Sequence, residues 1–212
     1  MTTLIVDYGM GNLRSVQKAF EHIQEPAEIC SSPTALAKAT RIVLPGVGAF
    51  RDAIAALHHH DLVNVLKDAI AADRPFLGIC LGMQLLFSSS LEDGHHQGLD
   101  VIPGVVQRFQ LPAEFKIPHM GWNQLSTAQS PPHTLFSNLP PNPWFYFVHS
   151  YHCVPGDNSW VAATTSYGNP FVSAVARSNV MAVQFHPEKS QSAGLQLLRN
   201  FVSRTQPLNQ DP

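Results

Sequence analysis

One cysteine lies between two glycines, in the segment Gly78-Ile79-Cys80-Leu81-Gly82. A short apolar run precedes this cysteine, and apolar residues at helical spacing follow it. This is the nucleophile-elbow pattern with Cys in place of Ser, and its glycines relieve crowding in a tight strand-to-helix turn. A helix beginning at Leu81 would direct its N–H groups toward the sulfur and favour the thiolate. We therefore expect Cys80 to be a nucleophile rather than a packing residue.

A cysteine nucleophile needs a base, and the base needs an orienting group. The best candidates are His186 and Glu188, which flank Pro187 directly after an apolar run over 181–185. In an extended backbone, residues i and i+2 point to the same side, and a proline disfavours helix at the residue before it. We therefore expect Glu188 to orient the imidazole of His186.

An acyl-transfer site also needs donors for an oxyanion. The N–H of Leu81, directly after the nucleophile, is one candidate. A second is the backbone at Val47 and Gly48, in the segment Pro45-Gly46-Val47-Gly48 that follows the apolar run 41–44. An ordinary strand-to-helix turn is the alternative interpretation of this segment.

The elements that position these residues alternate along the first half of the chain. Apolar strands are predicted at 4–6, 27–30, 41–44 and 75–79, and helices at 13–23, 49–72 with a break near His60-Asp61, and 81–87. Consecutive strands are predicted in the second half, at 144–148, 161–165, 171–176 and 181–185, before a last helix with Leu195, Leu198 and Val202 on one face. Near-continuous apolar strands alternating with helices indicate a parallel sheet.

The fold class is therefore α/β: a flavodoxin-like, open, mostly parallel sheet with flanking helices and an antiparallel β extension in the C-terminal half. No linker divides the chain. We expect a single domain over residues 1–204 and a frayed tail over 205–212.

Composition excludes several classes of function. Of the 212 residues, 44% are hydrophobic and 13% charged, and the formal net charge is −2, so there is no basic surplus for nucleic-acid binding. No apolar run reaches the roughly 18 residues that span a membrane, and the N-terminus lacks a signal-peptide pattern. Three cysteines, Cys30, Cys80 and Cys153, do not form a disulfide framework, which favours a cytoplasmic protein.

Histidine is abundant, with 11 residues, but its spacing does not match a zinc site. His58, His59 and His60 are adjacent on a predicted helix and point to different faces. We therefore expect no metal. His149 and His152 flank Ser150-Tyr151; a second catalytic histidine is the alternative interpretation, but we expect both to be structural.

Three motifs together resemble the class I (triad) glutamine amidotransferases over nearly the whole chain. They are Pro45-Gly46-Val47-Gly48, Gly78-Ile79-Cys80-Leu81-Gly82-Met83-Gln84 and Gln184-Phe185-His186-Pro187-Glu188. Three further segments, at 7–13, 118–123 and 188–190, resemble the glutaminase subunits of imidazole glycerol phosphate synthases.

The resemblance implies that Cys80 attacks the side-chain amide of L-glutamine and forms a thioester, without a cofactor. His186 would protonate the departing ammonia and then activate water, while Glu188 holds His186. The implied glutamine-binding residues are Gly46, Gln84, Ser150 and Tyr151.

The resemblance also implies a heterodimer with a (β/α)8-barrel cyclase. Ammonia would pass to that partner, which makes imidazole glycerol phosphate and an aminoimidazole carboxamide ribonucleotide in histidine biosynthesis. A low-charge surface agrees with a sizeable interface. The implied interface and coupling residues are Asn12, His119, Met120, Trp122, Asn123 and Lys189. Alternatives are core packing for Trp122, a solvated side chain for Lys189 and a helix N-cap for Asn12.

Two other interpretations stay open. A stand-alone cysteine hydrolase of the peptidase or deglycase type could share the fold, but it would not need Gln84 or the segment 118–123. A non-catalytic interaction subunit is disfavoured by the intact set Cys80, His186 and Glu188. Among amidotransferases, anthranilate and GMP synthase partners would share these three residues without predicting the segment 7–12.

Overall fold

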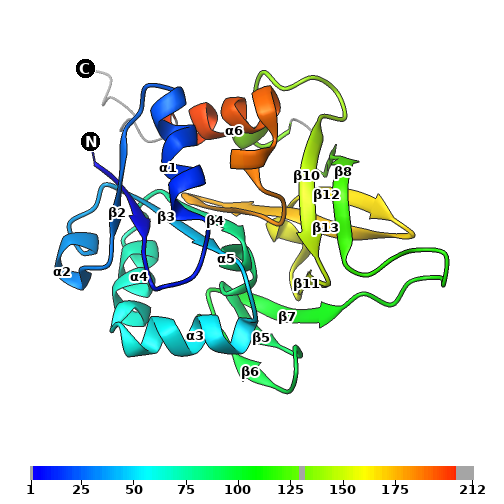
Figure 1. The fold of residues 1–212 in the computed structure, drawn as a ribbon, viewed down its shortest axis with the longest axis horizontal. Coiled ribbons are helices and arrows are strands. Elements are labelled where there is room, and N and C mark those ends of the chain that lie inside the picture. The colour runs from blue at the N-terminus through cyan, green and yellow to red at the C-terminus, as the bar shows by residue number, and fades with distance from the viewer. Residues whose placement is uncertain (1, 129–131, 204–212) are drawn as a thin grey trace.

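The computed structural model describes residues 2–128 and 132–203. Its centre is a block of five parallel strands in the order β2-β1-β3-β4-β14 (Figure 1). The strands are β1 (Thr3–Val6), β2 (Ala27–Cys30), β3 (Arg41–Gly46), β4 (Phe76–Cys80) and β14 (Val180–Val183). This is the strand order of flavodoxin-like doubly wound sheets, so the predicted fold class is confirmed.

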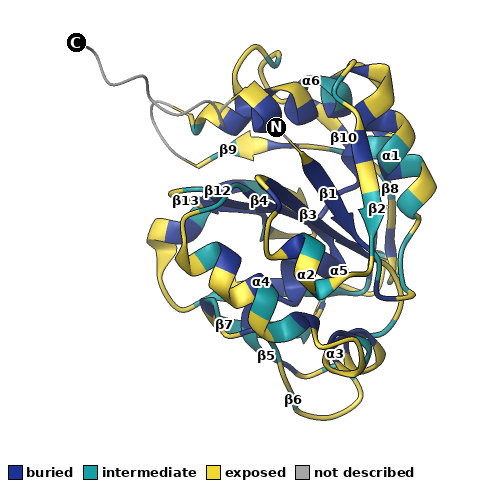
Figure 2. Cartoon of the chain, turned by 90° about the vertical axis from the view of Figure 1, so that its left-hand side faces the viewer, coloured by how far each residue is buried: buried dark blue, intermediate teal, exposed yellow. Residues whose placement is uncertain are grey.

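Helices cover both faces of this block (Figures 1 and 2). One face is covered by α1 (Leu13–His22) and α6 (Gln191–Ser203), and the other by α2 (Pro33–Leu36), α3 (Phe50–His59) and α4 (Leu62–Ala71). Successive strand residues point to opposite faces, so Leu4 and Val6 pack with one helical layer and Ile5 with the other. This explains why the strands are apolar without alternation. The predicted break between α3 and α4 is confirmed at Asp61, which has a φ of 55°.

Strands that pair mostly antiparallel extend the sheet beyond β14, as predicted. The path continues through β13 (Asn169–Arg177), β11 (Tyr151–Pro155), β7 (Ile102–Arg108), β5 (Phe87–Ser90) and β6 (His96–Gln97), while β12 (Val161–Tyr167) joins β13 to β9 (Ser126–Thr127). The pair β5 and β7 is parallel, unlike the rest of the extension. The extension therefore also includes strands from the middle of the chain. A separate antiparallel pair consists of β8 (His119–Gln124) and β10 (Trp144–His149). Short 3-10 turns lie at Thr134–Phe136, Asn158–Trp160 and Pro187–Lys189.

The predicted helix over 81–87 is wrong beyond its first turn. The helix α5 covers only Leu81–Gln84, and the chain enters β5 at Phe87. The carbonyl of Leu86 accepts hydrogen bonds from the N–H groups of Val101 and Ile102, so pairing with a distant segment replaces helical bonds. The strand β14 also ends at Val183, earlier than the predicted 185. The predicted frayed tail, 205–212, lies outside the described residues.

Within residues 2–128 and 132–203, no helix is long and apolar enough to cross a membrane. The same ranges contain no group of three or more His, Cys, Asp or Glu side chains that could hold a metal ion. All three cysteines are free thiols. Cys30 ends β2 and is partly buried, and Cys153 is buried within β11.

Candidate active site

Cys80 lies in a strained turn between β4 and α5. Its φ of 55° and ψ of −110° are unusual for a residue with a side chain, and such a conformation costs about 1–3 kcal/mol. In the sheet, Cys80 at the end of β4 pairs with Gly46 at the end of β3. The predicted elbow is therefore present as a backbone conformation.

The glycines beside Cys80 are needed for packing against neighbouring strands, not to avoid the nucleophile itself. A methyl group on Gly82 would overlap the carbonyl oxygen of Leu44 on β3. A methyl group on Gly78 would lie 2.9 Å from the Gly82 oxygen and 3.0 Å from Ala182 on β14. Only glycine lets the first turn of α5 lie this close to the sheet, so the spacing Gly-x-Cys-x-Gly has a direct steric cause.

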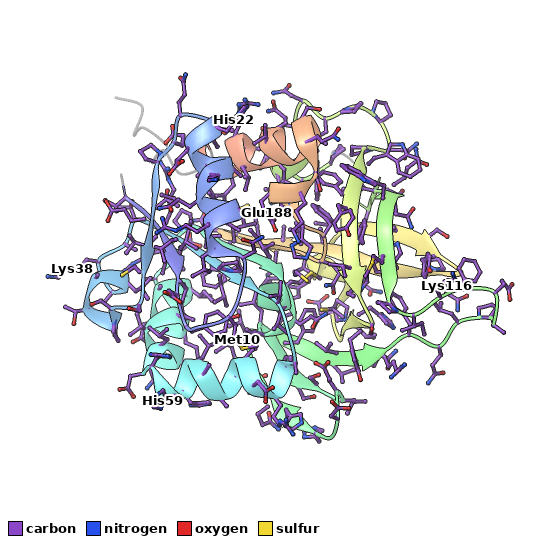
Figure 3. The ribbon with its side chains drawn as sticks, viewed as in Figure 1. Met10, His22, Lys38, His59, Lys116 and Glu188 are labelled. Atoms are coloured by element: carbon purple, nitrogen blue, oxygen red, sulfur yellow. The ribbon has the colours of Figure 1, made fainter. Side chains whose placement is uncertain are left out.

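The predicted pair His186 and Glu188 is formed. Nδ1 of His186 lies 2.7 Å from Oε1 of Glu188, and both side chains are 2% exposed. Figure 3 shows Glu188 in the interior, where α1 and α6 approach the C-terminal strands. Because a buried carboxylate accepts from Nδ1, the other ring nitrogen, Nε2, is the one available for proton transfer. This Nε2 makes no hydrogen bond with any described residue.

The turn that carries this pair differs from the expected extended strand. Pro187–Lys189 form a 3-10 turn, closed by a 3.0 Å hydrogen bond from the Lys189 N–H to the His186 carbonyl. The Ser190 hydroxyl donates to the same carbonyl at 2.6 Å and accepts from the Tyr146 N–H at 3.0 Å. His186 in turn donates its N–H to the Tyr146 carbonyl at 2.9 Å. The turn is thereby fastened to β10.

The charge state of His186 depends on its neighbours. Burial lowers the pKa of His186, but Cys80 and then Glu188 oppose this effect and raise the pKa to about 10. The raised pKa favours the imidazolium, which is the form that can donate a proton to a leaving group.

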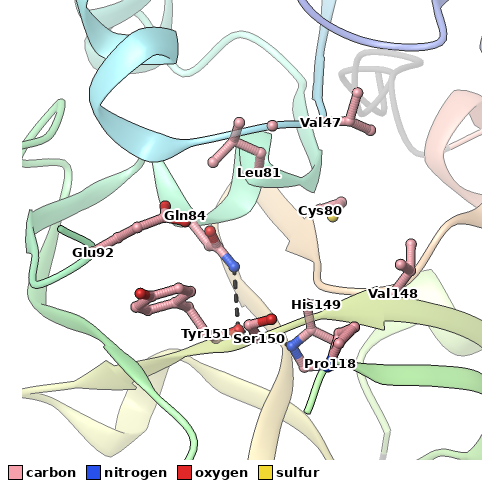
Figure 4. Close-up of a pocket in the computed structure, with 11 residues that line it drawn as sticks. Val47, Cys80, Leu81, Gln84, Glu92, Pro118, Val148, His149, Ser150 and Tyr151 are labelled. Atoms are coloured by element: carbon pink, nitrogen blue, oxygen red, sulfur yellow. Dashed lines mark hydrogen bonds between the residues drawn. The ribbon is translucent and has the colours of Figure 1, made fainter.

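A pocket of about 330 Å³ opens in front of Cys80 (Figure 4). This volume suits a small ligand. Besides Cys80, its lining includes six predicted site residues, namely Val47, Gly48, Leu81, Gln84, Ser150 and Tyr151. His186 and Glu188 are not among the lining residues. Gly46 does not line the pocket, because it lies beside Cys80 in the sheet. Glu92, Pro118, Val148 and His149 also line it, and sequence reasoning did not assign them to the site.

Gln84 links the pocket wall to the cysteine. Its Nε2 donates to the Tyr151 carbonyl at 3.3 Å (Figure 4) and to Oε1 of Gln184 at 3.0 Å. Nε2 of Gln184 then donates to Sγ of Cys80 at 3.7 Å. An N–H donor on the sulfur stabilises negative charge there. Gln184 belongs to the motif that contains His186 and Glu188. Its contact with Cys80 could not be predicted from the sequence, because the two residues are 104 positions apart.

The loop over 46–49 is fastened at both ends by side chains. The buried Tyr8 hydroxyl donates to the Pro45 carbonyl at 2.9 Å, and Oε2 of Glu92 accepts from the Phe50 N–H at 2.8 Å. Burial, with a smaller effect of Cys80, raises the pKa of Tyr8 well above its usual value, so the hydroxyl stays a donor. Gly48, inside the loop, has a φ of 107°.

The predicted interface residues divide into two groups. Met120 and Trp122 are 62% and 44% exposed on the outer face of β8, so core packing does not apply to Trp122. Lys189 is exposed, with its ammonium 6.0 Å from the ring centre of Tyr146. His119 and Asn123 instead point inward from the same strand. Asn12 is the N-cap of α1, where its side chain accepts from the Ser15 N–H at 3.4 Å.

Comparison with known proteins agrees with this geometry. Residues 4–205 match the family described as glutamine amidotransferase class-I. A protein of Syntrophotalea carbinolica named imidazole glycerol phosphate synthase subunit HisH is 53% identical over 203 residues, covering 93% of this chain and 98% of the relative. The subunit HisH of Salinibacter ruber is 50% identical over 206 residues, covering 95% of this chain and 94% of the relative.

Solved structures show the same fold at low identity. PurLQS from Thermotoga maritima superposes with a TM-score of 0.72 at 16% identity, covering 97% of this chain and 99% of that one. A glutamine amidotransferase from the same organism gives a TM-score of 0.66 at 15% identity, with 97% of each chain covered. The chain belongs to the class-I glutamine amidotransferase family, among the HisH subunits of imidazole glycerol phosphate synthase.

Proposed function

We propose that this chain hydrolyses L-glutamine to glutamate and ammonia through a thioester on Cys80. The observation that carries the proposal is a strained cysteine that lines a pocket together with a loop whose glycine has a positive φ. The buried pair of His186 and Glu188 lies close enough to Cys80 for the sulfur to raise the pKa of His186. The family membership and the HisH relatives support the same reaction. The proposed reaction uses only protein groups and needs no cofactor.

In the first half of the reaction, the Cys80 thiolate attacks the side-chain carbonyl carbon of glutamine. The oxyanion accepts hydrogen bonds from the Leu81 N–H and from the backbone at Val47 and Gly48. As the first residue of α5, Leu81 has no intrahelical partner for its N–H. Nε2 of His186 gives its proton to the amide nitrogen, the carbon–nitrogen bond breaks, and ammonia leaves the thioester.

In the second half, neutral His186 takes a proton from water, and the resulting hydroxide attacks the thioester carbon. The carbon–sulfur bond breaks, glutamate leaves, and the thiolate–imidazolium pair is restored. Glu188 holds His186 in one orientation through both steps. The 2.7 Å contact between two buried side chains supports this role.

Glutamine carries an ammonium and a carboxylate that need partners. Glu92 supplies a carboxylate at the pocket wall, opposite in charge to the ammonium. Gln84, with its Nε2 engaged by Tyr151 and Gln184, presents its remaining carbonyl oxygen as a second acceptor. We propose that backbone groups at Ser150 and Tyr151 complete the binding site, and that Gly46, beside Cys80 in the sheet, supports it from outside the lining.

We further propose that ammonia passes to a (β/α)8-barrel cyclase in a heterodimer. That partner would use it to make imidazole glycerol phosphate and an aminoimidazole carboxamide ribonucleotide in histidine biosynthesis. Two observations support a partner: the relatives are named as subunits, and Met120 and Trp122 expose large apolar surface on β8. Asn12, exposed at the start of α1, and Lys189 extend the same proposed interface.

Residues 1–204 are proposed to act as one domain, because one sheet joins strands from both halves of the chain. A cytoplasmic location is proposed from the three free thiols and from the biosynthetic relatives. No contact with nucleic acid or membrane has a place in this scheme.

The test measures glutamate release by the purified chain, alone and mixed with the barrel cyclase and its nucleotide ligand. We expect weak hydrolysis alone and strong stimulation in the mixture. Strong hydrolysis without a partner would contradict the coupling, and hydrolysis of peptides or glycated amines instead of glutamine would favour a stand-alone cysteine hydrolase.

A further inference from the structure

A chain of hydrogen bonds joins the inner side of β8 to the wall of the Cys80 pocket. Asn123 Nδ2 lies 3.3 Å from Nε2 of His119, and Nδ1 of His119 lies 3.0 Å from Nε2 of His149. Nδ1 of His149 then lies 2.8 Å from the carbonyl oxygen of Tyr151. The Tyr151 oxygen also accepts from Gln84. Gln84 bonds to Gln184, and Gln184 bonds to Cys80, so the series of hydrogen bonds reaches the cysteine.

The chemistry of the two ends fixes the direction of every bond. A carbonyl oxygen only accepts, so Nδ1 of His149 carries the proton and its Nε2 is an acceptor. His119 must therefore donate from Nδ1, which leaves its Nε2 to accept from the Asn123 amide. The orientation of Asn123 agrees, because Nδ2 also donates to the Ser166 carbonyl at 2.9 Å and Oδ1 accepts from the Gln124 N–H at 2.8 Å.

Both histidines are held neutral, as this scheme requires. Burial lowers the pKa of His119 to about 4. Burial also lowers the pKa of His149 to about 3; the hydrogen bond to Tyr151 opposes the effect, and nearby His119, His152 and His186 add to it. A neutral histidine with one buried donor and one buried acceptor has a single stable tautomer, so each ring holds its neighbours in fixed positions.

The series of hydrogen bonds begins at Asn123 and His119 on β8, the strand that exposes Met120 and Trp122. Successive residues of β8 alternate, so these two side chains face outward while His119 and Asn123 face inward. Displacement of β8 by a bound molecule would move the His119 ring and hence the groups it holds.

We propose that His149 and His119 are positioning residues that hold the Tyr151 carbonyl, and with it Gln84, in the glutamine site and connect that site to β8. The proposal rests on the proposed glutaminase function and deepens it. His149 lines the pocket and His119 does not, and both would act through Tyr151 and Gln84. Their contribution is expected in glutamine binding and in the response to the partner, rather than in the chemical step.

Two substitutions at His149 separate its two hydrogen bonds. His149→Asn places an amide N–H near the position of Nδ1, so the bond to Tyr151 is kept and the bond from His119 is lost. His149→Gln places an amide oxygen near the position of Nε2, so the bond from His119 is kept and the bond to Tyr151 is lost. With the cyclase present, we expect His149→Gln to raise KM for glutamine about tenfold with little change in kcat. We expect His149→Asn to keep KM within about twofold and to lose most of the stimulation by the cyclase.

The matched control is His22→Asn, which makes the same change at an exposed histidine in the last turn of α1, so KM and stimulation should stay at wild-type values. Nitrogen NMR of the wild-type chain tests the same proposal without a variant: both rings should show the neutral Nδ1–H tautomer near pH 7.

Three results would overturn the proposal: wild-type KM in His149→Gln, equal impairment of His149→Asn and His149→Gln, or a charged or Nε2–H ring at either histidine. A wild-type chain that hydrolyses no glutamine with the cyclase would instead reject the proposed function, and the NMR tautomers would still decide whether the chain of hydrogen bonds exists.

Discussion

The buried carboxylate of Glu188 allows a sharp test of the proposed acid–base pair. Glu188→Gln keeps the size of the side chain and an oxygen that can accept from Nδ1 of His186, but it removes the negative charge. The wild-type contact is 2.7 Å long and both side chains are 2% exposed, so solvent does not screen it. A hydrogen bond to a charged group contributes about 1.5–3 kcal/mol, so kcat should fall about 10- to 150-fold.

The pH dependence should change with a defined sign. Burial lowers the pKa of His186, and the opposing effects of Cys80 and then Glu188 raise it to about 10. Removing the Glu188 charge leaves burial and Cys80 in place, so the pKa falls. The protonated form that donates to the leaving ammonia is then lost at lower pH, and the alkaline limb of kcat should move to lower pH.

The assay follows glutamate release with the cyclase present, at saturating glutamine, between about pH 6 and pH 10. Glu114→Gln, which makes the same change on an exposed loop, is the control and should match wild type. A Glu188→Gln variant with wild-type kcat and an unmoved alkaline limb would refute the reasoning, because His186 would then not depend on this carboxylate.

Three further substitutions test the supports of the site. Tyr8→Phe removes the donor to the Pro45 carbonyl and should lower the free energy of unfolding by about 1 kcal/mol in urea; unchanged stability would show that the contact is neutral. Gly82→Ala forces a methyl group onto the Leu44 carbonyl and should lower the free energy of unfolding in urea by about 1–3 kcal/mol. Gly156→Ala is the control, because its methyl group would lie 3.4 Å from the nearest atom, and its free energy of unfolding should not fall. Trp122→Ala should weaken cyclase binding about 30-fold in titration calorimetry; wild-type affinity would place the interface elsewhere.

The parallel core was predictable because its signals are local. Apolar runs such as 41–44 and 75–79 are buried on both faces. The glycines on either side of Cys80 are required by close packing, and their spacing is visible in the sequence. The contact between His186 and Glu188 was predicted as well. Its actual geometry, a 3-10 turn, depends on Ser190 and on β10, which no local pattern reveals.

The rest of the site depends on contacts between distant segments. Residues 85–87 have a helical pattern, but pairing of this region with 101–102 and β7 converts it to strand, so tertiary hydrogen bonds override the local preference. The strands β8 and β11 contain glycine, histidine and proline, which weakened their signal. His149 was expected to be structural, and it is neutral and hydrogen-bonded, but its proposed role arises from partners on other segments.

The central claim is that Cys80 carries a glutamyl thioester during turnover. The most direct measurement is mass spectrometry of enzyme quenched in acid during glutamine hydrolysis, followed by proteolysis to locate any adduct. We predict a glutamyl group on the peptide that contains Cys80, and neither adduct nor hydrolysis in Cys80→Ala. A glutamyl group on Cys30 or Cys153, or glutamine hydrolysis by Cys80→Ala, would contradict it.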